Sequence, residues 1–347
     1  MDDTSVTSLH VREIKNIDEL NSIRDEWAEL YSASLNAVPF LSPAWVMPWW
    51  KYFGNNQLWT LAVYNRRILV GLAPMYIYNY KSQNGYLRQV TFLGTGNTDS
   101  MDILCRKDFE EESVKLTMDF LTGCKDCWDV CDFQELRSSS PILKIKAPEG
   151  FEVAIQNSGV RPVVKLPANF HEYLSMLPVS FRKNTLRARR QLTDSGTISL
   201  HLATEEYLEE YTGWLFRLHN ASRQFRNTPG LFEDNTLQYF HKEVSKEFFL
   251  IGILRLYVLK HNERIIAAVY SFIKNKRLYY YIGGFEPEMA KYSPGSVILL
   301  EIIEKAITEG VREFDFLRGR EDYKYKWNAE DRNNYRLFIR KISTSLK

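Results

Sequence analysis

The sequence has little cysteine, no long apolar run and no excess of charge of either sign. Only four cysteines occur, Cys105, Cys124, Cys127 and Cys131, and such sparse use in a long chain suits a reducing compartment. Cys124 and Cys127 form a single C-x-x-C pair, and no second pair or nearby histidine completes four zinc ligands. We therefore predict no metal site.

The absence of apolar and basic runs limits where the protein works and what it binds. Residues 1–4 are acidic and polar, unlike a secretory signal, and no stretch approaches the roughly 20 apolar residues of a membrane span. We predict a cytoplasmic protein and leave peripheral membrane association open. The 45 basic residues balance 43 acidic ones to a net charge of +2, so we predict no DNA partner. Serine hydrolases and P-loop enzymes are unsupported because G-x-S-x-G and Walker motifs are missing.

The composition that remains is that of a globular protein. Hydrophobic residues make up 45% of the chain and charged residues 25%, so there is ample material for a core. Aromatic residues make up 14%, which suits sheet-rich cores and clefts for organic groups. At about 100–200 residues per domain, 347 residues correspond to about two domains.

A weak internal duplication is the most informative pattern. Residues 58–72 and 254–269 each contain two β-branched and aromatic runs around a short polar turn, which predicts a hairpin. Each hairpin follows two helical segments and precedes a strand, a helix and a last strand with Asp-Phe. These flanking segments are 17–34, 42–53, 86–93, 108–123 and 132–133 in the first half, and 205–223, 234–247, 277–284, 295–310 and 315–316 in the second. Both halves therefore have the predicted order ααβββαβ.

The two copies meet in a turn-rich stretch. Ser, Pro and Gly gather in 138–142 and 147–150, and 159–166 has the pattern of a new strand. We therefore predict an N-terminal domain over 1–158 and a C-terminal domain over 159–347.

Motifs in the second half point to a family. They read YIGGFEPE, YSPGS, DFLRGRE and YKYKW, at 281–288, 292–296, 315–321 and 323–327. With the order ααβββαβ they resemble the GNAT acyltransferases, and two such units in tandem resemble the Fem-type peptidyl transferases. The second half is similar to the acetyltransferases of bacterial cellulose and exopolysaccharide synthesis (the CelD type), strongly over 180–330. The resemblance implies an α/β (α+β) fold of two tandem GNAT-like domains, each a mixed, mostly antiparallel sheet flanked by helices.

The loop at 292–296 precedes a helix whose first acidic residue is Glu301. Unpaired N–H groups at a helix start attract phosphate, and in the GNAT family this position holds the pyrophosphate of coenzyme A. The resemblance thus implies acetyl-CoA or another acyl-CoA as cosubstrate. Its predicted binding residues are Tyr281, Ile282 and Gly283 for the pantetheine arm, and Ser293, Pro294, Gly295 and Ser296 for the phosphates. A simple capped helix start is the alternative.

The matching helix of the first half begins with acids. Glu110, Glu111 and Glu112 stabilise a helix start but repel a pyrophosphate. We therefore predict one cofactor site, in the second half, and a degenerate first half that is structural or binds the acceptor.

Acyl transfer needs a base for the acceptor proton and an acid for the leaving thiolate. His219 and Asp315 are the candidate bases, with a packing role for His219 and an ion pair with Arg318 or Arg320 for Asp315 as the alternatives. Tyr323 is the candidate acid, and the resemblance pairs it with Lys324. These four residues form the predicted catalytic set.

Acceptor binding is assigned to charged residues outside this set. A helical stretch at 180–192 carries five basic residues and no acid, Arg187 among them, and a solvated helix face is the alternative. Asp99 and Asp102 lie in a loop after a strand, where they can bind sugar hydroxyls or an amine, or form Asx turns. The predicted substrate-binding residues are Asp99, Asp102, Arg187, Arg318 and Glu321.

These assignments predict an acyl-CoA-dependent acyltransferase. Direct N- or O-acetyl transfer to a sugar, polysaccharide precursor or envelope metabolite is the first interpretation, with a small-molecule or saccharide acceptor and a place in a polysaccharide-synthesis complex. One alternative is a Fem-type aminoacyl transferase in cell-wall synthesis, which would bring tRNA as a partner. Another is a non-catalytic component of an exopolysaccharide complex.

Overall fold

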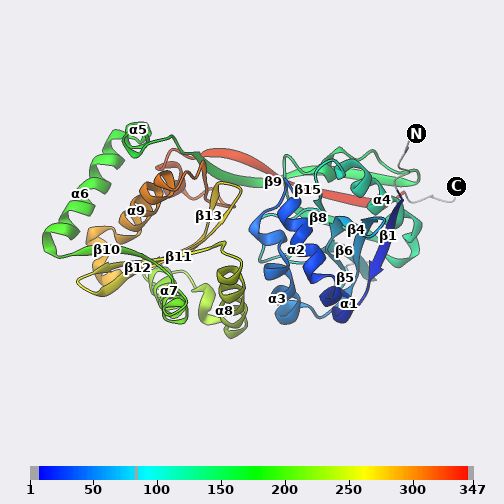
Figure 1. The fold of residues 1–347 in the computed structure, drawn as a ribbon, viewed down its shortest axis with the longest axis horizontal. Helices are drawn as coiled ribbons and strands as arrows, with labels where there is room; N and C mark the ends of the chain where they lie inside the picture. The colour runs from blue at the N-terminus through cyan, green and yellow to red at the C-terminus, as the bar shows by residue number, and fades with distance from the viewer. Residues whose placement is uncertain (1–7, 83–84, 343–347) are drawn as a thin grey trace, which may run out of the picture. The chain divides into compact units, whose positions relative to one another are not determined.

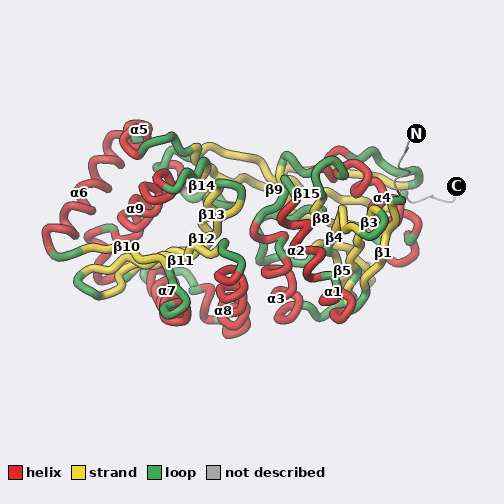
Figure 2. Tube along the Cα trace, viewed as in Figure 1, coloured by secondary structure: helices red, strands yellow, loops and turns green. Residues whose placement is uncertain are grey.

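A computed structural model describes residues 8–82 and 85–342 of the chain. Its elements group into two compact units: unit 1 is Met1–Gly159 with Asn333–Lys347, and unit 2 is Val160–Arg332. Figures 1 and 2 show the elements of both. The chain passes from unit 1 to unit 2 between Gly159 and Val160, beside the predicted boundary at 158/159. It returns to unit 1 at Asn333, whereas we placed this last segment in the C-terminal domain.

Unit 2 is an antiparallel sheet with one parallel pair. Its strands lie in the order β10 (Ile198–Leu202), β11 (Leu254–His261), β12 (Arg264–Lys274), β13 (Arg277–Phe285), β14 (Glu313–Asp315) and the second half of β9 (Phe151–Lys165). Only β13 and β14 are parallel, and helix α9 (Pro294–Thr308) connects them. The predicted segments of the second half are therefore confirmed.

Helices cover both faces of this sheet (Figure 1). α7 (Leu208–Gln224) and α8 (Asn235–Leu250) lie on one face, and α9 lies on the other beneath α5 (Phe170–Met176) and α6 (Val179–Ser195). α9 is apolar almost all round, because α6 covers the side that the sheet does not, and Val297, Leu300 and Ile303 are fully buried. The short helix α10 (Asp322–Tyr325) follows β14.

Unit 1 has two sheets. One contains β1 (Leu9–Ile14), β3 (Thr60–Asn65), β4 (Ile68–Ala73) and β7 (Leu104–Cys105). The other contains β15 (Glu330–Lys341), β8 (Val130–Arg137), β6 (Gly85–Phe92), β5 (Met75–Ser82) and β2 (Gln57–Leu58), in that order. The helices are α1 (Ile17–Ser22), α2 (Arg24–Ala33), α3 (Pro43–Phe53) and α4 (Glu110–Gly123).

The predicted segments of the first half are confirmed with two differences. The stretch 17–34 forms two helices rather than one, because the backbone leaves the helical conformation at Ile23. The unit also has three strands, β1, β5 and β7, that the predicted order ααβββαβ does not contain. Ser42 precedes Pro43 at the start of α3, and its hydroxyl donates to Pro39 O over 2.7 Å rather than capping the helix.

The two units share details of register as well as order. In each, a strand, a helix and a parallel strand follow one another: β6–α4–β8 and β13–α9–β14. The hairpins β3–β4 and β11–β12 each shift register by one residue, after Val63 and after Leu259. These matching irregularities support a duplication more strongly than element order alone.

A diagonal ion pair repeats in the same way. Asp132 of β8 stands opposite Phe338 of β15 and pairs with Arg336, two residues earlier. Asp315 of β14 stands opposite Val163 of β9 and pairs with Arg161, two residues earlier. β9 is the last strand of the first half of the sequence, yet its end pairs with β14 of unit 2. β15 is the last strand of the second half, yet it pairs with β8 of unit 1. The two halves therefore exchange their last strands.

Two kinds of site are not found in the part of the chain that the structure describes. No helix there is long and apolar enough to span a membrane. No group of three His, Cys, Asp or Glu side chains there is arranged to hold a metal ion.

Candidate active site

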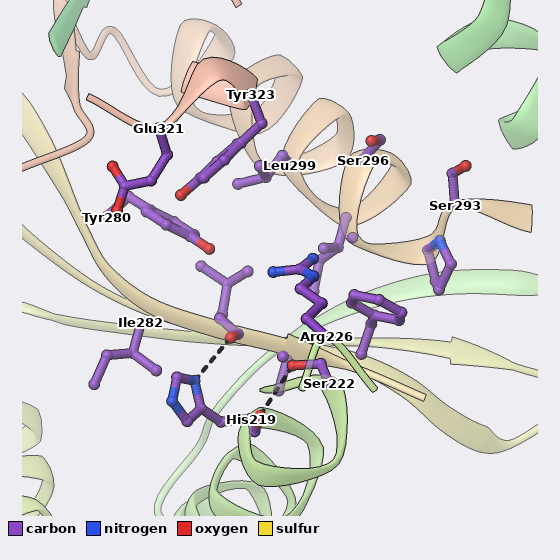
Figure 3. Close-up of a pocket in the computed structure, with 18 of the residues that line it drawn as sticks. His219, Ser222, Arg226, Tyr280, Ile282, Ser293, Ser296, Leu299, Glu321 and Tyr323 are labelled. Carbon is purple, nitrogen blue, oxygen red and sulfur yellow. Dashed lines mark hydrogen bonds between the residues drawn. The ribbon is translucent and has the colours of Figure 1, made fainter. Parts of the chain in front are cut away.

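Strand β13 has one edge that is only partly paired. Its parallel pairing with β14 ends at Tyr279, and residues 280–285 continue along a cavity of about 680 Å³ in unit 2 (Figure 3). Glu286 N–H bonds Ile266 O on β12, so by the alternation of an antiparallel ladder Gly283 and Phe285 direct their peptide groups away from β12. The sheet therefore directs backbone groups that β12 does not bind towards a cavity.

A β-bulge lies within this edge. Ile282 stands opposite Tyr270 and Tyr280 opposite Ser271, so Tyr281 is the extra residue of the bulge. A bulge increases local twist and changes the direction of side chains, and it is frequent beside active sites. Next to it, a Cβ on Gly284 would lie 2.2 Å from the backbone nitrogen of His219. Only glycine allows α7 to approach β13 this closely.

His219 lies on α7 beside this edge. Its Nδ1 is 3.1 Å from Gly283 O, and since a carbonyl oxygen can only accept, Nδ1 carries the proton in the neutral ring and Nε2 is left as the acceptor (Figure 3). Burial, with smaller contributions from Arg223 and Arg226, lowers the pKa of His219 below its usual 6.5. His219 is therefore neutral near pH 7 and can accept a proton through Nε2.

Two tyrosine hydroxyls meet across the cavity from His219. The Tyr280 hydroxyl lies over Gly283, where a Cβ would be only 2.5 Å away, and the Tyr323 hydroxyl lies near it (Figure 3). Burial, followed by the neighbouring Tyr280 and Glu321, raises the pKa of Tyr323 far above its usual value. Tyr323 as a whole is 37% exposed, so its buried end still borders open space. It stays protonated near neutral pH and can donate a proton.

The start of α9 lines the other end of the cavity (Figure 3). Pro294 has no N–H, and Ser296 N–H bonds Ser293 O over 2.9 Å, so the N–H of Gly295 is the first donor directed out of the helix. Ser293 is in the left-handed conformation with φ 51°. Ser293 and Ser296 line the cavity together with Gly295. The first turn contains no acidic residue. This end suits a negatively charged group.

Three basic residues complete the lining and were missed from the sequence. They are Arg223, Arg226 and Lys326. Figure 3 shows Arg226 extending into the cavity, and its guanidinium carbon lies 5.3 Å from the Phe285 ring. Arg223 follows His219 by four positions on α7, which is the spacing of one helix face, so the sequence held a signal for it. Arg226 lies in the turn after α7.

All seven predicted cofactor-binding residues line this cavity. They are Tyr281, Ile282, Gly283, Ser293, Pro294, Gly295 and Ser296. His219, Tyr323 and Glu321 line it as well. Ten predicted residues from four separate segments are therefore brought together, and their roles remain predictions.

Asp315 lies outside the cavity. It is fully buried, one carboxylate oxygen pairs with Arg161, and the other accepts the Leu317 N–H over 3.0 Å. An ion pair was the alternative to catalysis, but its partner is Arg161 on β9 rather than Arg318 or Arg320. The equivalent Asp132 is held in the same way in unit 1, so the pair belongs to the fold, and this geometry argues against Asp315 as a base.

Lys324 also lies outside the cavity. Only 3% of it is exposed, and its ammonium donates to Arg318 O over 2.7 Å and to Gly319 O over 3.3 Å. A third partner is the Glu321 carboxylate at 2.8 Å. With its three donors engaged inside the protein, Lys324 is not placed to touch a bound substrate.

Four predicted substrate-binding residues lie away from the cavity. Arg187 is exposed on α6, and Arg318 is exposed in the loop after β14. Asp99 and Asp102 are buried in unit 1, where Asp102 accepts from Ser140 Oγ over 2.7 Å and from the Ile103 N–H. Burial raises the pKa of Asp102 to about 6. Its carboxyl group is thus bound within unit 1, to the neighbouring Ile103 and to Ser140, which is distant in the sequence.

Comparison with known proteins agrees with this geometry. Residues 179–325 match the model of a family described as an acetyltransferase (GNAT) domain. The match spans fewer than half of the residues but contains His219, β13, the start of α9 and Tyr323. This part of unit 2 is thus similar to GNAT acetyltransferase domains. A search of curated proteins found no match.

Solved structures show the fold of the whole chain. A structure of FemX is similar with a TM-score of 0.66 and 10% identity, covering 96% of this chain and 98% of its own. A protein of unknown function from Bacteroides thetaiotaomicron has a TM-score of 0.56 at 11% identity, covering 92% and 97%. At these identities the likeness shows the fold alone.

Proposed function

We propose that the protein transfers an acyl group from acyl-CoA, first of all acetyl-CoA, to a small-molecule or saccharide acceptor. One observation carries the proposal: the unpaired edge of β13 runs along a single cavity that has an acid-free helix start at one end and His219 and Tyr323 at the other. The GNAT domain match supports acyl transfer in general.

The cavity fits the parts of coenzyme A. The Gly295 N–H, the Ser293 and Ser296 hydroxyls, and Arg223, Arg226 and Lys326 offer donors and positive charge for phosphates. The peptide groups of Gly283 and Phe285 can bond the amides of the pantetheine arm as a strand would. In unit 1 the matching helix α4 begins with three glutamates, so we propose one site per chain.

The side chains supply both proton transfers. Acyl-CoA brings the thioester to be attacked. His219 Nε2 accepts the proton of the acceptor amine or hydroxyl, and the Gly283 carbonyl holds the imidazole in the tautomer that leaves Nε2 bare. The Tyr323 hydroxyl, protonated at neutral pH, gives its proton to the departing thiolate. The acceptor then carries the acyl group, and coenzyme A leaves as the thiol.

The acceptor is the least constrained part of the proposal. The resemblance to CelD-type acetyltransferases supports a sugar, a polysaccharide precursor or an envelope metabolite, by analogy of family. We propose that the reaction takes place in the cytoplasm, where acyl-CoA is available.

Calorimetric titration with acetyl-CoA tests the proposal. We expect one site per chain, and Gly295→Glu should abolish binding by placing a carboxylate at the phosphate end of the cavity. A Cβ at Gly295 meets only Phe285, at 3.5 Å, so the variant should fold. The control is Gly213→Glu on α7, where a Cβ has no neighbour within 4 Å and which does not line the cavity. Two equivalent sites, or unchanged binding by Gly295→Glu, would refute the assignment.

Aminoacyl transfer from aminoacyl-tRNA is a second candidate, favoured by one surface. Lys183, Arg187 and Arg190 are exposed on α6 at helical spacing, while Arg189 of the same helix pairs with Glu301 and Glu304 of α9. Three solvated cations on one face suit a nucleic-acid backbone. Binding of tRNA that weakens steeply with salt, and that is lost when all three become Ser, would favour this function over the first.

A further inference from the structure

The segment that follows β14 brings Glu321 and Tyr323 to the cavity through an irregular path. Leu317 has a φ of 57°, which is unusual for a residue with a branched side chain, and Gly319 has a φ of 109°. The four-residue helix α10 then turns Tyr323 towards Tyr280 (Figure 3). Neither a long helix nor a full strand fixes this path, so other contacts must hold the Tyr323 hydroxyl in place.

The start of the segment is anchored on β9 and β14. Phe316 N–H bonds Pro162 O over 2.9 Å, and Gly319 N–H bonds Val160 O over 3.2 Å. Asp315 accepts the Leu317 N–H with the oxygen that does not pair with Arg161. These contacts fix the chain as far as Gly319. They do not reach Glu321 or α10.

The Phe316 ring contacts the Tyr323 ring, and the buried ammonium of Lys324 adds a polar connection between residues 318–321 and α10. It bonds the carbonyls of Arg318 and Gly319 and the carboxylate of Glu321, so three donors meet three acceptors. A buried ammonium is costly unless its donors are satisfied, and these partners are present only when residues 318–321 fold back over α10. Lys324 is also the neighbour of Tyr323 on α10. The loop conformation and the position of the Tyr323 hydroxyl are therefore set together.

We propose that Lys324 is a positioning residue that closes residues 318–321 over α10 and thereby sets the Tyr323 hydroxyl beside Tyr280. Lys324 acts through Tyr323 and does not touch the substrate. The kinetic consequence rests on the proposed acyltransfer, whereas the closure of the loop does not.

Hydrogen exchange tests the loop directly. Lys324→Met keeps the length and the apolar body of the side chain but removes all three donors. We expect the amides of 318–323 to exchange at least tenfold faster in this variant, with no change in β12. Lys305→Met is the matched control, because Lys305 makes an exposed pair with Glu309 one turn away on α9. If Lys324→Met does not fold, Lys324→Gln retains part of the network and should show a smaller change in the same amides. Unchanged exchange in a folded variant overturns the proposal.

Kinetics test whether the loop acts through Tyr323. The probe is acetyl-CoA alone, with water as acceptor and release of the free thiol as the readout. Lys324→Met should lower kcat about tenfold with KM within twofold, and Tyr323→Phe combined with Lys324→Met should be no slower than Tyr323→Phe alone. If the double variant lost kcat by the product of the two single-variant losses, Lys324 would act independently of Tyr323, and the positioning role would be refuted. A wild-type protein that fails to bind acetyl-CoA would refute the proposed function, and hydrogen exchange would still decide the loop.

Discussion

Units 1 and 2 have the same strand–helix–parallel strand arrangement and differ where that helix begins. α4 starts with Glu110, Glu111 and Glu112, whereas α9 starts with Pro294, Gly295 and Ser296 after a left-handed Ser293. The acids stabilise α4 through its dipole and make its N-terminus unsuitable for an anion. The two units therefore differ at a few residues of one helix start. In unit 2 these residues suit an anion, and in unit 1 they do not.

The features that the units share identify the contacts that belong to the fold. The pairs Asp132–Arg336 and Asp315–Arg161 occupy the same diagonal between the same two strands of each copy. His219, by contrast, bonds the open edge of β13 beside the cavity. A contact that is repeated in both units thus indicates a structural role. A contact beside the cavity that occurs in unit 2 alone indicates a functional one.

The exchange of last strands predicts that the chain cannot be divided at the sequence boundary. A fragment 1–158 would expose the edge of β8 that β15 covers, and a fragment 159–347 would carry all of β15 without β8. We expect each fragment alone to lack cooperative unfolding in circular dichroism, whereas a fragment 160–332, which keeps β9 with β14, should fold. Cooperative unfolding of 1–158 on its own would show that the exchange is dispensable.

The two diagonal ion pairs should differ in their contribution to stability. Asp315→Asn leaves the Arg161 side chain, 4% exposed, as a buried charge without its carboxylate, and we expect a loss of about 3–5 kcal/mol in the free energy of unfolding. Asp132→Asn leaves Arg336, which is 39% exposed and can be solvated, so the loss should be about 1–2 kcal/mol. Urea unfolding measures both. Equal losses would mean that exposure of the arginine does not decide the cost.

The sequence predicted local features of the fold well. Hydrophobic periodicity and turn residues depend on neighbouring residues, and they located the hairpins and helices of both halves. The exchange of β9 and β15 was not predictable, because a strand's own pattern does not say which of two equivalent edges it joins. β15 itself was missed, since 330–341 is mostly polar or charged and only half buried.

The candidate site shows the same limit. The glycines and serines of 281–296 were found because helix starts and close backbone approaches need those residue types. Asp315 and Lys324 lie outside the cavity, and the sequence does not show this because it shows a charge but not its partner. Arg161 is 154 positions away from Asp315, and the carbonyls around Lys324 depend on a loop conformation. Arg226 was missed for the opposite reason, because an arginine at a helix end is ordinary until the cavity beside it is known.

Acid should stabilise unit 1 through Asp102. Its native pKa, raised to about 6 by burial, lies above the 3.8 of an ordinary aspartate, so the folded state binds more protons between these values. The free energy of unfolding should therefore rise as the pH falls from 6 to 4, by at most about 3 kcal/mol for a shift of about two units. Asp102→Asn should remove this pH dependence. Identical pH profiles of wild type and Asp102→Asn in urea unfolding would show that the carboxyl group is not protonated in the folded protein.

Acid should have the opposite effect on the reaction in unit 2. His219 accepts a proton only when neutral, and its native pKa is lowered below 6.5, so acyltransfer should persist below pH 6.5 and then fall about tenfold per pH unit as the imidazole becomes charged. The pH profile of kcat/KM for acetyl-CoA, with thiol release as the readout, measures this acidic limb. Because burial is the largest cause of the shift and Arg223 a smaller one, Arg223→Gln should move the limb only slightly towards higher pH. An acidic limb with its midpoint above pH 6.5, or one that survives His219→Gln, would assign the titrating base to another group. Asp102→Asn is the control and should leave the limb unchanged, because that carboxyl group belongs to unit 1.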